Sequence, residues 1–356
     1  MVGLALRLMA VLALQGCAST TPPSQAVATP SREARLVDAR LSAEIDKAIT
    51  RNVQNGFSGV VLVARGADPI LLRGYGSQQG KSVAADDRFW LASTGKQFVS
   101  AAIFKLVEQR KVDLDDRLSR FFPSTPADTS EITVRQLLTH TSGLGQSYVS
   151  EGLLDRGIAV SRMLSEPLKG LPGIEFRYSN NNTQLAAAIV EVASGVTYPD
   201  FVSRFLWNPA GLTDTDLAGP QTSPTVNPIL GVLPQRLQQT YWGEQGVFST
   251  ATDLFKWHRA LRSNTILTES SVEEMLAPAV RIGEGHATPG WFRGATPRGT
   301  DFIFVRGNED FGANSLLYVY PARDTTIIVL THAGDADEDT SWSRRILQVV
   351  EQILGL

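Results

Sequence analysis

Strand-like segments lie near both ends of the folded part of this chain, and helix-like segments fill its middle. Apolar and β-branched residues dominate five strand-like segments, of which the first two would form a hairpin around Gly66-Ala67-Asp68. This order predicts an α/β fold, in which one antiparallel sheet is built from both chain ends and flanked by helices, with a mostly helical insertion at roughly 112–260. The predicted strands are 59–64, 69–75, 302–306, 315–320 and 325–331, and the predicted helices are 36–53, 96–109, 133–138, 181–194, 252–262 and 340–354.

The composition is that of a globular chain with a large core. The 356 residues are 43% hydrophobic and 19% charged, enough to form one large domain or two intimate ones. The net charge of −3 comes from interspersed acidic and basic residues, without the basic stripe that nucleic-acid binding requires. The four histidines have no ligand-like spacing, which argues against a zinc site. We therefore expect neither nucleic acid nor metal to bind.

Residues 1–16 have the pattern of a lipoprotein signal peptide. Arg7 precedes an apolar run, 8–14, that is too short to span a bilayer. The run ends in Leu14-Gln15-Gly16-Cys17, which resembles a bacterial lipobox, the signal for cleavage before a cysteine that becomes lipidated. Cys17 is the only cysteine, so it forms no intramolecular disulfide. Lipidation of Cys17 would attach the chain to a membrane, and the alternative is a plain secretory signal with an incidental cysteine.

The segment after the lipobox is expected to be a flexible tether. Residues 17–35 are mostly small and polar and include prolines, which is typical of a linker. The folded domain is then expected at 36–356. Ala18, rather than Asp, follows the cysteine, and lipoprotein sorting rules then predict the periplasmic side of an outer membrane, or a cell-surface anchor in a host without one. Export separates the chain from cytosolic nucleotide cofactors, and we expect no cofactor.

Ser93 and Lys96 form the chain's only S-x-x-K pattern, at the junction of a strand-like stretch, 88–92, and the helix expected from residue 96. Residues three apart share a helix face, so the Lys96 amine would lie beside the Ser93 hydroxyl. The partial positive charge of a helix N-terminus disfavours a protonated lysine there and favours a serine alkoxide or an acyl oxyanion. The pair alone is also compatible with a capping serine and an exposed lysine.

Tyr178-Ser179-Asn180 is the only Y-x-N pattern and directly precedes an apolar helix. A tyrosine hydroxyl can act as a base when a neighbouring ammonium group favours its charged form. The amide of Asn180 offers both a donor and an acceptor, enough to orient a substrate amide and to hold Lys96. The alternative is structural: Tyr178 as a buried aromatic residue and Asn180 as a helix cap.

The two patterns, in this order, resemble the serine β-lactamase and penicillin-binding protein superfamily, specifically the branch of class C β-lactamases, D,D-peptidases and related esterases. The resemblance covers about 51–356. It implies that Ser93 is the nucleophile, Lys96 its proton partner, Tyr178 the base and Asn180 an amide-binding residue. It also implies a β-lactamase-like fold. Three further segments match: Leu137-Leu138-Thr139-His140-Thr141-Ser142-Gly143-Leu144, Phe176-Arg177-Tyr178-Ser179-Asn180 and Gly246-Val247-Phe248-Ser249-Thr250-Ala251-Thr252-Asp253-Leu254. In the first of them, the resemblance implies that His140 belongs to a structural turn.

The family's third motif, Lys or His followed by any residue and then Gly, is altered in this chain. The matching place holds Arg306-Gly307-Asn308, followed by Glu309. Arg306 keeps a positive charge that would bind a substrate carboxylate in a bidentate manner. Asn308 would stand where the family has glycine and would obstruct the approach of substrate to the strand. In this register the oxyanion hole uses the N–H groups of Ser93 and Glu309.

The sequence therefore predicts a serine hydrolase that acts through a Ser93 acyl-enzyme. Its expected substrates are small molecules or peptides with an amide or ester: D-amino-acid peptides such as those of peptidoglycan, β-lactams, or small esters. Substrate selection is expected in loops such as 146–157 and 217–242. The alternative is a non-catalytic or weakly active wall-binding lipoprotein on the same fold, which Asn308 and Glu309 would favour.

Overall fold

The computed structural model describes residues 32–78, 80–153, 155–218, 242–243, 246–309, 312–333 and 341–356. The predicted signal peptide, the predicted lipidation site Cys17 and residues 17–31 of the predicted tether lie outside these ranges. Most of the loop 217–242 lies outside them as well.

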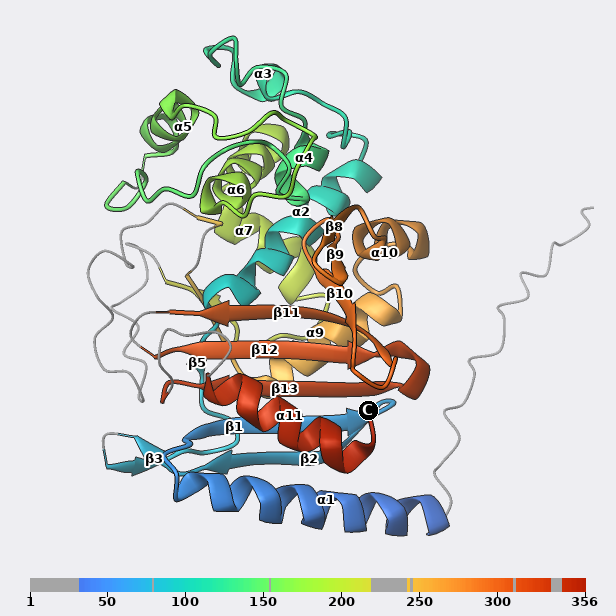
Figure 1. Cartoon of the computed structure of the whole chain (residues 1–356). Helices are drawn as coiled ribbons and strands as arrows, with labels where there is room; N and C mark the ends of the chain where they lie inside the picture. Colours follow the sequence, from blue (N-terminus) through green and yellow to red (C-terminus); the bar gives the residue numbers. More distant parts are fainter. Residues whose placement is uncertain are drawn as a thin grey trace, which may run out of the picture.

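An eight-stranded antiparallel sheet is the centre of the fold, in the order β2-β1-β13-β12-β11-β10-β9-β8 (Figure 1). The N-terminal strand β1 pairs along its whole length with β13, near the C-terminus, so the sheet is assembled from both chain ends as predicted. Its strands are β1 (Gly59–Arg65), β2 (Asp68–Tyr75), β8 (Val280–Ile282), β9 (Gly285–Ala287), β10 (Phe292–Ala295), β11 (Asp301–Asn308), β12 (Asn314–Tyr320) and β13 (Thr325–Thr331).

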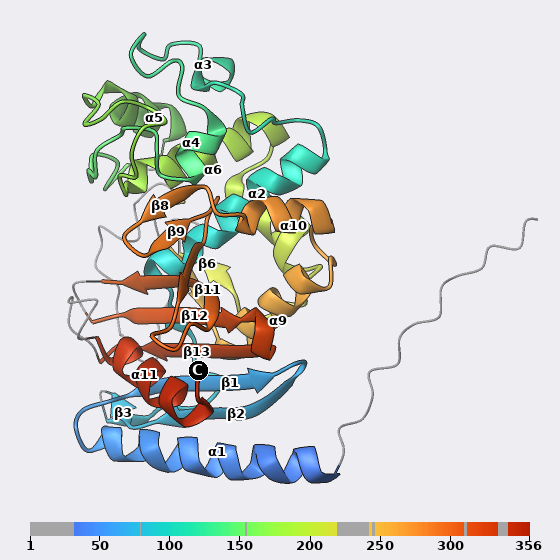
Figure 2. The same ribbon diagram turned by 45° about the vertical axis from the view of Figure 1, so that its right-hand side comes forward.

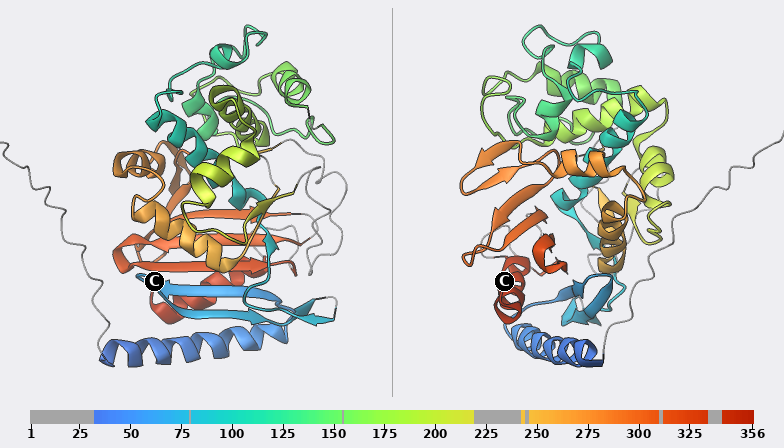
Figure 3. Two further views of the ribbon diagram at one scale, coloured as in Figure 1. Left: turned by 180° about the vertical axis from the view of Figure 1, so that it is seen from behind. Right: turned by 90° about the vertical axis from the view of Figure 1, so that its right-hand side faces the viewer.

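Both faces of the central strands are buried, because alternate side chains enter two different cores. In β1, Val60 and Leu62 pack into a core shared with the helical lobe described below and with α9 (Ala251–Arg262). Val61 and Val63 pack into a second core, shared with α1 (Arg32–Val53) and α11 (Trp342–Leu354). Figure 3 shows α9 crossing the face of the sheet opposite α11. This double burial explains why β1 and β13 read as continuous apolar runs.

A helical lobe covers one end of the sheet (Figure 2), and it includes residues 96–108, which precede the insertion predicted at roughly 112–260. Its centre is the packed pair α2 (Lys96–Glu108) and α6 (Asn180–Ser194). Most side chains of both helices are fully buried. The other elements here are η1 (Ala92–Gly95), α3 (Leu118–Phe121), α4 (Val134–Leu138), α5 (Arg156–Ser165), α7 (Tyr198–Val202) and η2 (Ser203–Trp207).

A second, three-stranded sheet leads the chain into the lobe. It has the order β5 (Phe89–Trp90), β7 (Val247–Ser249) and β6 (Asp216–Leu217). The strand expected at 88–92 is therefore reduced to two residues. The remaining described elements are β3 (Ser77–Gln78), β4 (Lys81–Ser82), α10 (Glu269–Leu276) and η3 (Pro321–Arg323).

Several boundaries differ from the sequence-based expectation. Helix α1 begins at Arg32, inside the segment predicted as tether, and α11 begins at Trp342 instead of residue 340. Strands β8 to β10 were not predicted, because each has only three or four residues and includes charged residues or glycine. They extend the sheet from β11 toward the helical lobe (Figure 2).

Within the described ranges, no single helix is long and apolar enough to cross a membrane; α6 with the α7–η2 segment meets that test only as a pair bent by 77°.

Candidate active site

Ser93, Lys96 and Tyr178 meet at the junction of the sheet and the helical lobe. Lys96 Nζ donates a hydrogen bond to Ser93 Oγ over 2.9 Å, and the Tyr178 hydroxyl donates to the same oxygen over 2.8 Å. Lys96 Nζ also lies 5.5 Å from the centroid of the Tyr178 ring. Lys96 is only 7% exposed, so its interaction with both partners is weakly screened by water. Tyr178, which lies 85 positions after Ser93 in the sequence, thus contacts the same hydroxyl as Lys96.

Ser93 lies on the 3-10 turn η1, immediately before α2. The preceding residue, Ala92, has φ 46°, a left-handed conformation that costs free energy for a residue with a side chain. Leu91 O anchors the turn: it accepts from Thr94 N over 3.0 Å and from Ser315 Oγ over 2.6 Å. A strained but anchored turn holds the Ser93 side chain in one orientation.

Gly307 in β11 packs directly against the backbone of that turn. A Cβ atom at this position would lie 2.4 Å from Leu91 O and 2.7 Å from Ser93 N, so only glycine fits without movement of the turn. The position that demands glycine is therefore Gly307, and not Asn308 as the predicted register had it. Asn308 Oδ1 accepts a hydrogen bond from Asn314 Nδ2, and the residue lines the cleft beside Ser93. The expected obstruction of substrate by Asn308 stays a prediction.

The strand hydrogen bonds correct the predicted oxyanion hole as well. Glu309 N–H already donates to Ala313 O over 2.9 Å, across the hairpin to β12. Successive N–H groups of an antiparallel strand point to opposite sides, so the Asn308 N–H points away from β12. On that side β10 pairs with β11 only as far as Phe304. The bond to β12 therefore argues against Glu309 N–H as the second oxyanion donor.

The other predicted binding residues line the same cleft as Ser93, a space of about 920 Å³. They are Asn180, Arg306, Asn308 and Glu309. Trp90 Nε1 donates to Glu309 Oε1 over 3.2 Å, which holds this carboxylate at the side of the cleft.

Asn180 is the first residue of α6 and is 7% exposed. Its backbone N–H donates to Gln146 Oε1 over 2.7 Å. Gln146, Tyr148 and Glu151 also line the cleft, so the loop 146–157, expected to select substrates, does border the site.

His140 lies directly behind Tyr178, a contact that the sequence did not reveal. Its ring stacks on that of Tyr178 with centroids 4.7 Å apart and planes inclined by 26°. Nδ1 accepts from Ser179 N over 3.3 Å and lies 3.0 Å from Asn182 Nδ2. Ser142 Oγ donates to Asn182 Oδ1 over 2.5 Å, which orients the amide and assigns the ring proton to Nε2.

Burial, and then the positive charge of Lys96, lowers the pKa of His140 to about 3. The ring is therefore neutral at physiological pH. The segment predicted as a structural turn is one, but it also supplies the surface that holds Tyr178.

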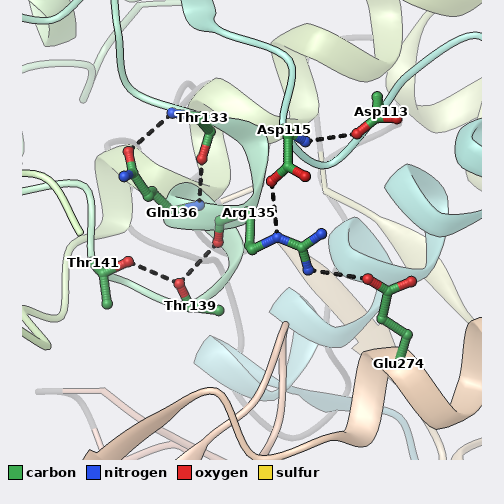
Figure 4. Close-up of polar contacts among 8 residues, drawn as sticks. All are labelled: Asp113, Asp115, Thr133, Arg135, Gln136, Thr139, Thr141 and Glu274. Carbon is green, nitrogen blue, oxygen red and sulfur yellow. Dashed lines mark hydrogen bonds and ion pairs between the residues drawn. The ribbon is translucent and has the colours of Figure 1, made fainter.

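Helix α4 positions this turn (Figure 4). Thr133 and Gln136 form a reciprocal capping box at its start, with bonds of 3.2 and 3.0 Å. Arg135 links α4 to Asp115 and to Glu274 of α10, at 3.0 Å each. The helix is thus fixed at both sides just before His140.

No group of three or more His, Cys, Asp or Glu side chains that could hold a metal ion occurs among the residues that the structure describes.

Comparison with known proteins places the chain in a family. The sequence model of the Beta-lactamase family matches residues 39–351. Penicillin-binding protein 4* of Bacillus subtilis (strain 168) is 27% identical over 340 aligned residues, which cover 86% of this chain and 74% of the relative.

Two solved structures share the fold. The penicillin binding protein from Bacillus halodurans superimposes with a TM-score of 0.72 at 22% identity, covering 88% of this chain and 98% of the other. The D-amino acid amidase from Ochrobactrum anthropi SV3, complexed with L-phenylalanine, gives a TM-score of 0.74 at 21% identity, covering 89% and 98%. Fold and family together indicate a hydrolase of the serine type. The chain belongs to the beta-lactamase family, within the superfamily of serine β-lactamases and penicillin-binding proteins.

Proposed function

We propose that this protein is a serine hydrolase that cleaves an amide or ester through an acyl-enzyme on Ser93. The observation that carries the proposal is the pair of hydrogen bonds that Ser93 Oγ accepts from Lys96 and Tyr178. An activated nucleophile needs a proton acceptor within hydrogen-bond reach, and here two candidate groups meet that condition.

In the acylation step Ser93 Oγ attacks the substrate carbonyl carbon. The hydroxyl proton passes through Lys96 and Tyr178 to the leaving nitrogen or oxygen, while the bond between that atom and the carbonyl carbon breaks. The N–H groups of Ser93 and Asn308 stabilise the negative oxygen of the tetrahedral intermediate. A water molecule then attacks the acyl carbon and gives a proton to the same pair of residues. The bond between that carbon and Ser93 Oγ breaks, the pair returns the proton to Oγ, and the acid is released.

The substrates we propose are small molecules or peptides: D-amino-acid peptides of the peptidoglycan type, β-lactams or small esters. Asn180 would bind the substrate amide, and Arg306 would bind a carboxylate. Both line the cleft beside Ser93. The names of the similar proteins support these classes, since one is a penicillin-binding protein and another a D-amino acid amidase.

We further propose that the chain is exported and anchored by a lipid on Cys17, on the periplasmic side of an outer membrane or at the cell surface. The support is the lipobox-like sequence before Cys17. The test is to express the chain and a Cys17→Ser variant in a bacterial host and to compare membrane and soluble fractions. Wild type is expected in the membrane fraction and the variant in the soluble one; equal partitioning would contradict the anchor.

The alternative is a non-catalytic wall-binding lipoprotein. Its support was the presence of Asn308 and Glu309 at the positions assigned to the third motif. The fit of Gly307 against the Ser93 turn weakens that argument. We therefore favour the enzyme.

The deciding experiment compares the purified full chain with a Ser93→Ala variant. Each is incubated with a fluorescent penicillin, a chromogenic cephalosporin and a p-nitrophenyl ester, and folding is checked by circular dichroism. We expect wild type to be labelled by, or to turn over, at least one reagent, and the variant to be inert. A folded wild type that reacts with none of the three would support the wall-binding alternative.

A further inference from the structure

Four phenylalanine side chains form a continuous aromatic wall on one side of the cleft. These residues, which we call the Phe wall, are Phe176, Phe292, Phe302 and Phe304. Each is partly exposed rather than buried in a core. Phe176 and Phe292 have ring centroids 6.3 Å apart, Phe292 and Phe304 5.4 Å, and Phe302 and Phe304 5.5 Å.

The sheet itself creates this wall. Phe292 of β10 is the direct cross-strand partner of Phe304 of β11. Side chains two positions apart on a strand point to the same face, so Phe302 continues the row begun by Phe304. The ring of Phe304 stacks on that of Tyr318 in β12, with ring centroids 4.7 Å apart and planes inclined by 24°. The wall is thus a rigid surface, preformed by strand pairing.

The wall reaches the catalytic residues on the side of Tyr178. Phe176 lies 5.8 Å from His140, between ring centroids, and His140 stacks on Tyr178. Phe292 also lines a smaller cavity of about 30 Å³ together with Ser93 and Lys96. In the proposed mechanism Tyr178 passes the proton to the leaving group, so the group nearest to the Phe wall is the one that departs.

We propose that the Phe wall is a leaving-group subsite that selects substrates with an apolar, preferably aromatic, group on the departing side of the scissile bond. This inference rests on the proposed serine hydrolase function and deepens it. A ring lying on the wall leaves water and meets aromatic edges and faces, both of which favour binding. Because the wall is close to the bond that breaks, this contact is available in the transition state and raises kcat/KM.

The test uses two ester series in which only one side of the scissile bond changes. The leaving-group series is ethyl acetate and benzyl acetate, whose alcohols are similarly basic; the acyl series is ethyl acetate and ethyl phenylacetate. In each reaction the alcohol leaves with a proton and Ser93 Oγ keeps the acyl group, which water then releases. For the full chain we expect kcat/KM to be ~10-fold higher for benzyl acetate than for ethyl acetate, with a much smaller preference in the acyl series.

Variants assign that preference to the wall. Phe292→Ala and Phe304→Ala should each lower kcat/KM for benzyl acetate by ~5-fold more than for ethyl acetate. Phe292→Leu keeps apolar volume and checks that a loss does not come from unfolding; it should keep part of the preference. The matched control is Phe205→Ala, because Phe205 is also partly buried but pairs with Phe201, outside the cleft.

The outcomes separate the two proposals. If the folded wild type hydrolyses none of the esters but reacts with the fluorescent penicillin or the chromogenic cephalosporin, the subsite is overturned while the hydrolase stands; if it reacts with none of these reagents, both proposals fail. If it hydrolyses ethyl and benzyl acetate equally, or if both alanine variants keep the benzyl preference, the subsite is overturned while the hydrolase stands. A preference confined to the acyl series would also overturn it, because the wall would then serve the other side of the bond.

Discussion

The imidazole of His140 lies against the phenol ring of Tyr178, with centroids 4.7 Å apart and planes inclined by 26°. The contact restricts rotation of the ring whose hydroxyl donates to Ser93 Oγ. Because His140 is neutral, it adds no positive charge beside Lys96. We therefore infer that His140 is a positioning residue, which would act on the proposed chemistry through Tyr178.

The first prediction concerns this stack. His140→Asn keeps a residue that tolerates φ 54° and can accept from Ser179 N–H, but it removes the ring. A stacked pair contributes about 0.5–1.5 kcal/mol, so kcat for a p-nitrophenyl ester should fall by roughly 3- to 10-fold. KM should change by less than about twofold, because the ground-state contacts remain. Steady-state kinetics at several pH values measures both, and a rise in KM alone would argue against a positioning role.

The second prediction concerns Gly307. Gly307→Ala places a methyl group against Leu91 O and Ser93 N, and the Ser93 turn must move. A displacement of about 1 Å at a nucleophile can cost ~100-fold in rate, so labelling by a fluorescent penicillin should slow by at least ~100-fold. The control is Gly211→Ala, where the added methyl group meets nothing within 4 Å and the residue is outside the cleft, and which should label at the wild-type rate once folded. Equal rates for the two variants would show that the turn tolerates the methyl group.

The third prediction concerns Arg306. A charge-assisted hydrogen bond contributes about 1.5–3 kcal/mol, so Arg306→Gln should weaken binding of a carboxylate-bearing ligand by roughly 10- to 100-fold. The measurement is competitive inhibition of ester hydrolysis by D-alanyl-D-alanine and by its C-terminal amide. Only the acid should lose affinity. If the affinities for the acid and for the amide fall to the same extent, Arg306 stabilises the cleft but does not bind the carboxylate.

The fourth prediction concerns acid stability. Burial, with the positive charges of Arg262 and Arg259, lowers the pKa of His258 to about 3, and burial lowers the pKa of His332 to about 3 as well. In the unfolded chain a histidine titrates near 6.5, so below about pH 6.5 the unfolded state binds protons that the folded state excludes. The contribution of these two neutral histidines to the free energy of unfolding is therefore complete above about pH 6.5 and is lost as pH falls toward 3.

Each such histidine makes the free energy of unfolding fall by up to about 1.4 kcal/mol per pH unit within this window. His258→Leu should therefore reduce the number of protons taken up on unfolding by about one, so that the free energy of unfolding falls less steeply as pH decreases. Urea unfolding between pH 4 and 7 measures the slope. An unchanged slope would show that His258 takes up its proton equally in the folded and unfolded chain.

The sequence was sufficient for the fold class and for the three side chains that meet at Ser93 Oγ. The long apolar strands β1, β12 and β13 could be predicted because both of their faces are buried. Ser93, Lys96 and Tyr178 could be predicted because two spaced motifs resemble a known superfamily.

The remaining features depend on pairing in three dimensions. The short strands β8 to β10 have no periodicity of their own and exist through pairing with β11. The one-residue error at Gly307 has the same origin, since the face that a strand residue occupies is fixed by its neighbours in the sheet. The stack of His140 on Tyr178 joins two segments far apart in the chain, and no local pattern marks it.

The most direct measurement of the account as a whole is the mass of the acyl-enzyme. The full chain is mixed with a fluorescent penicillin, quenched in acid, and analysed as intact protein and as proteolytic peptides. We predict one adduct per chain, located on the peptide that contains Ser93, and none in the Ser93→Ala variant. An adduct on another residue, or one that persists in Ser93→Ala, would contradict the assignment of Ser93 as the nucleophile.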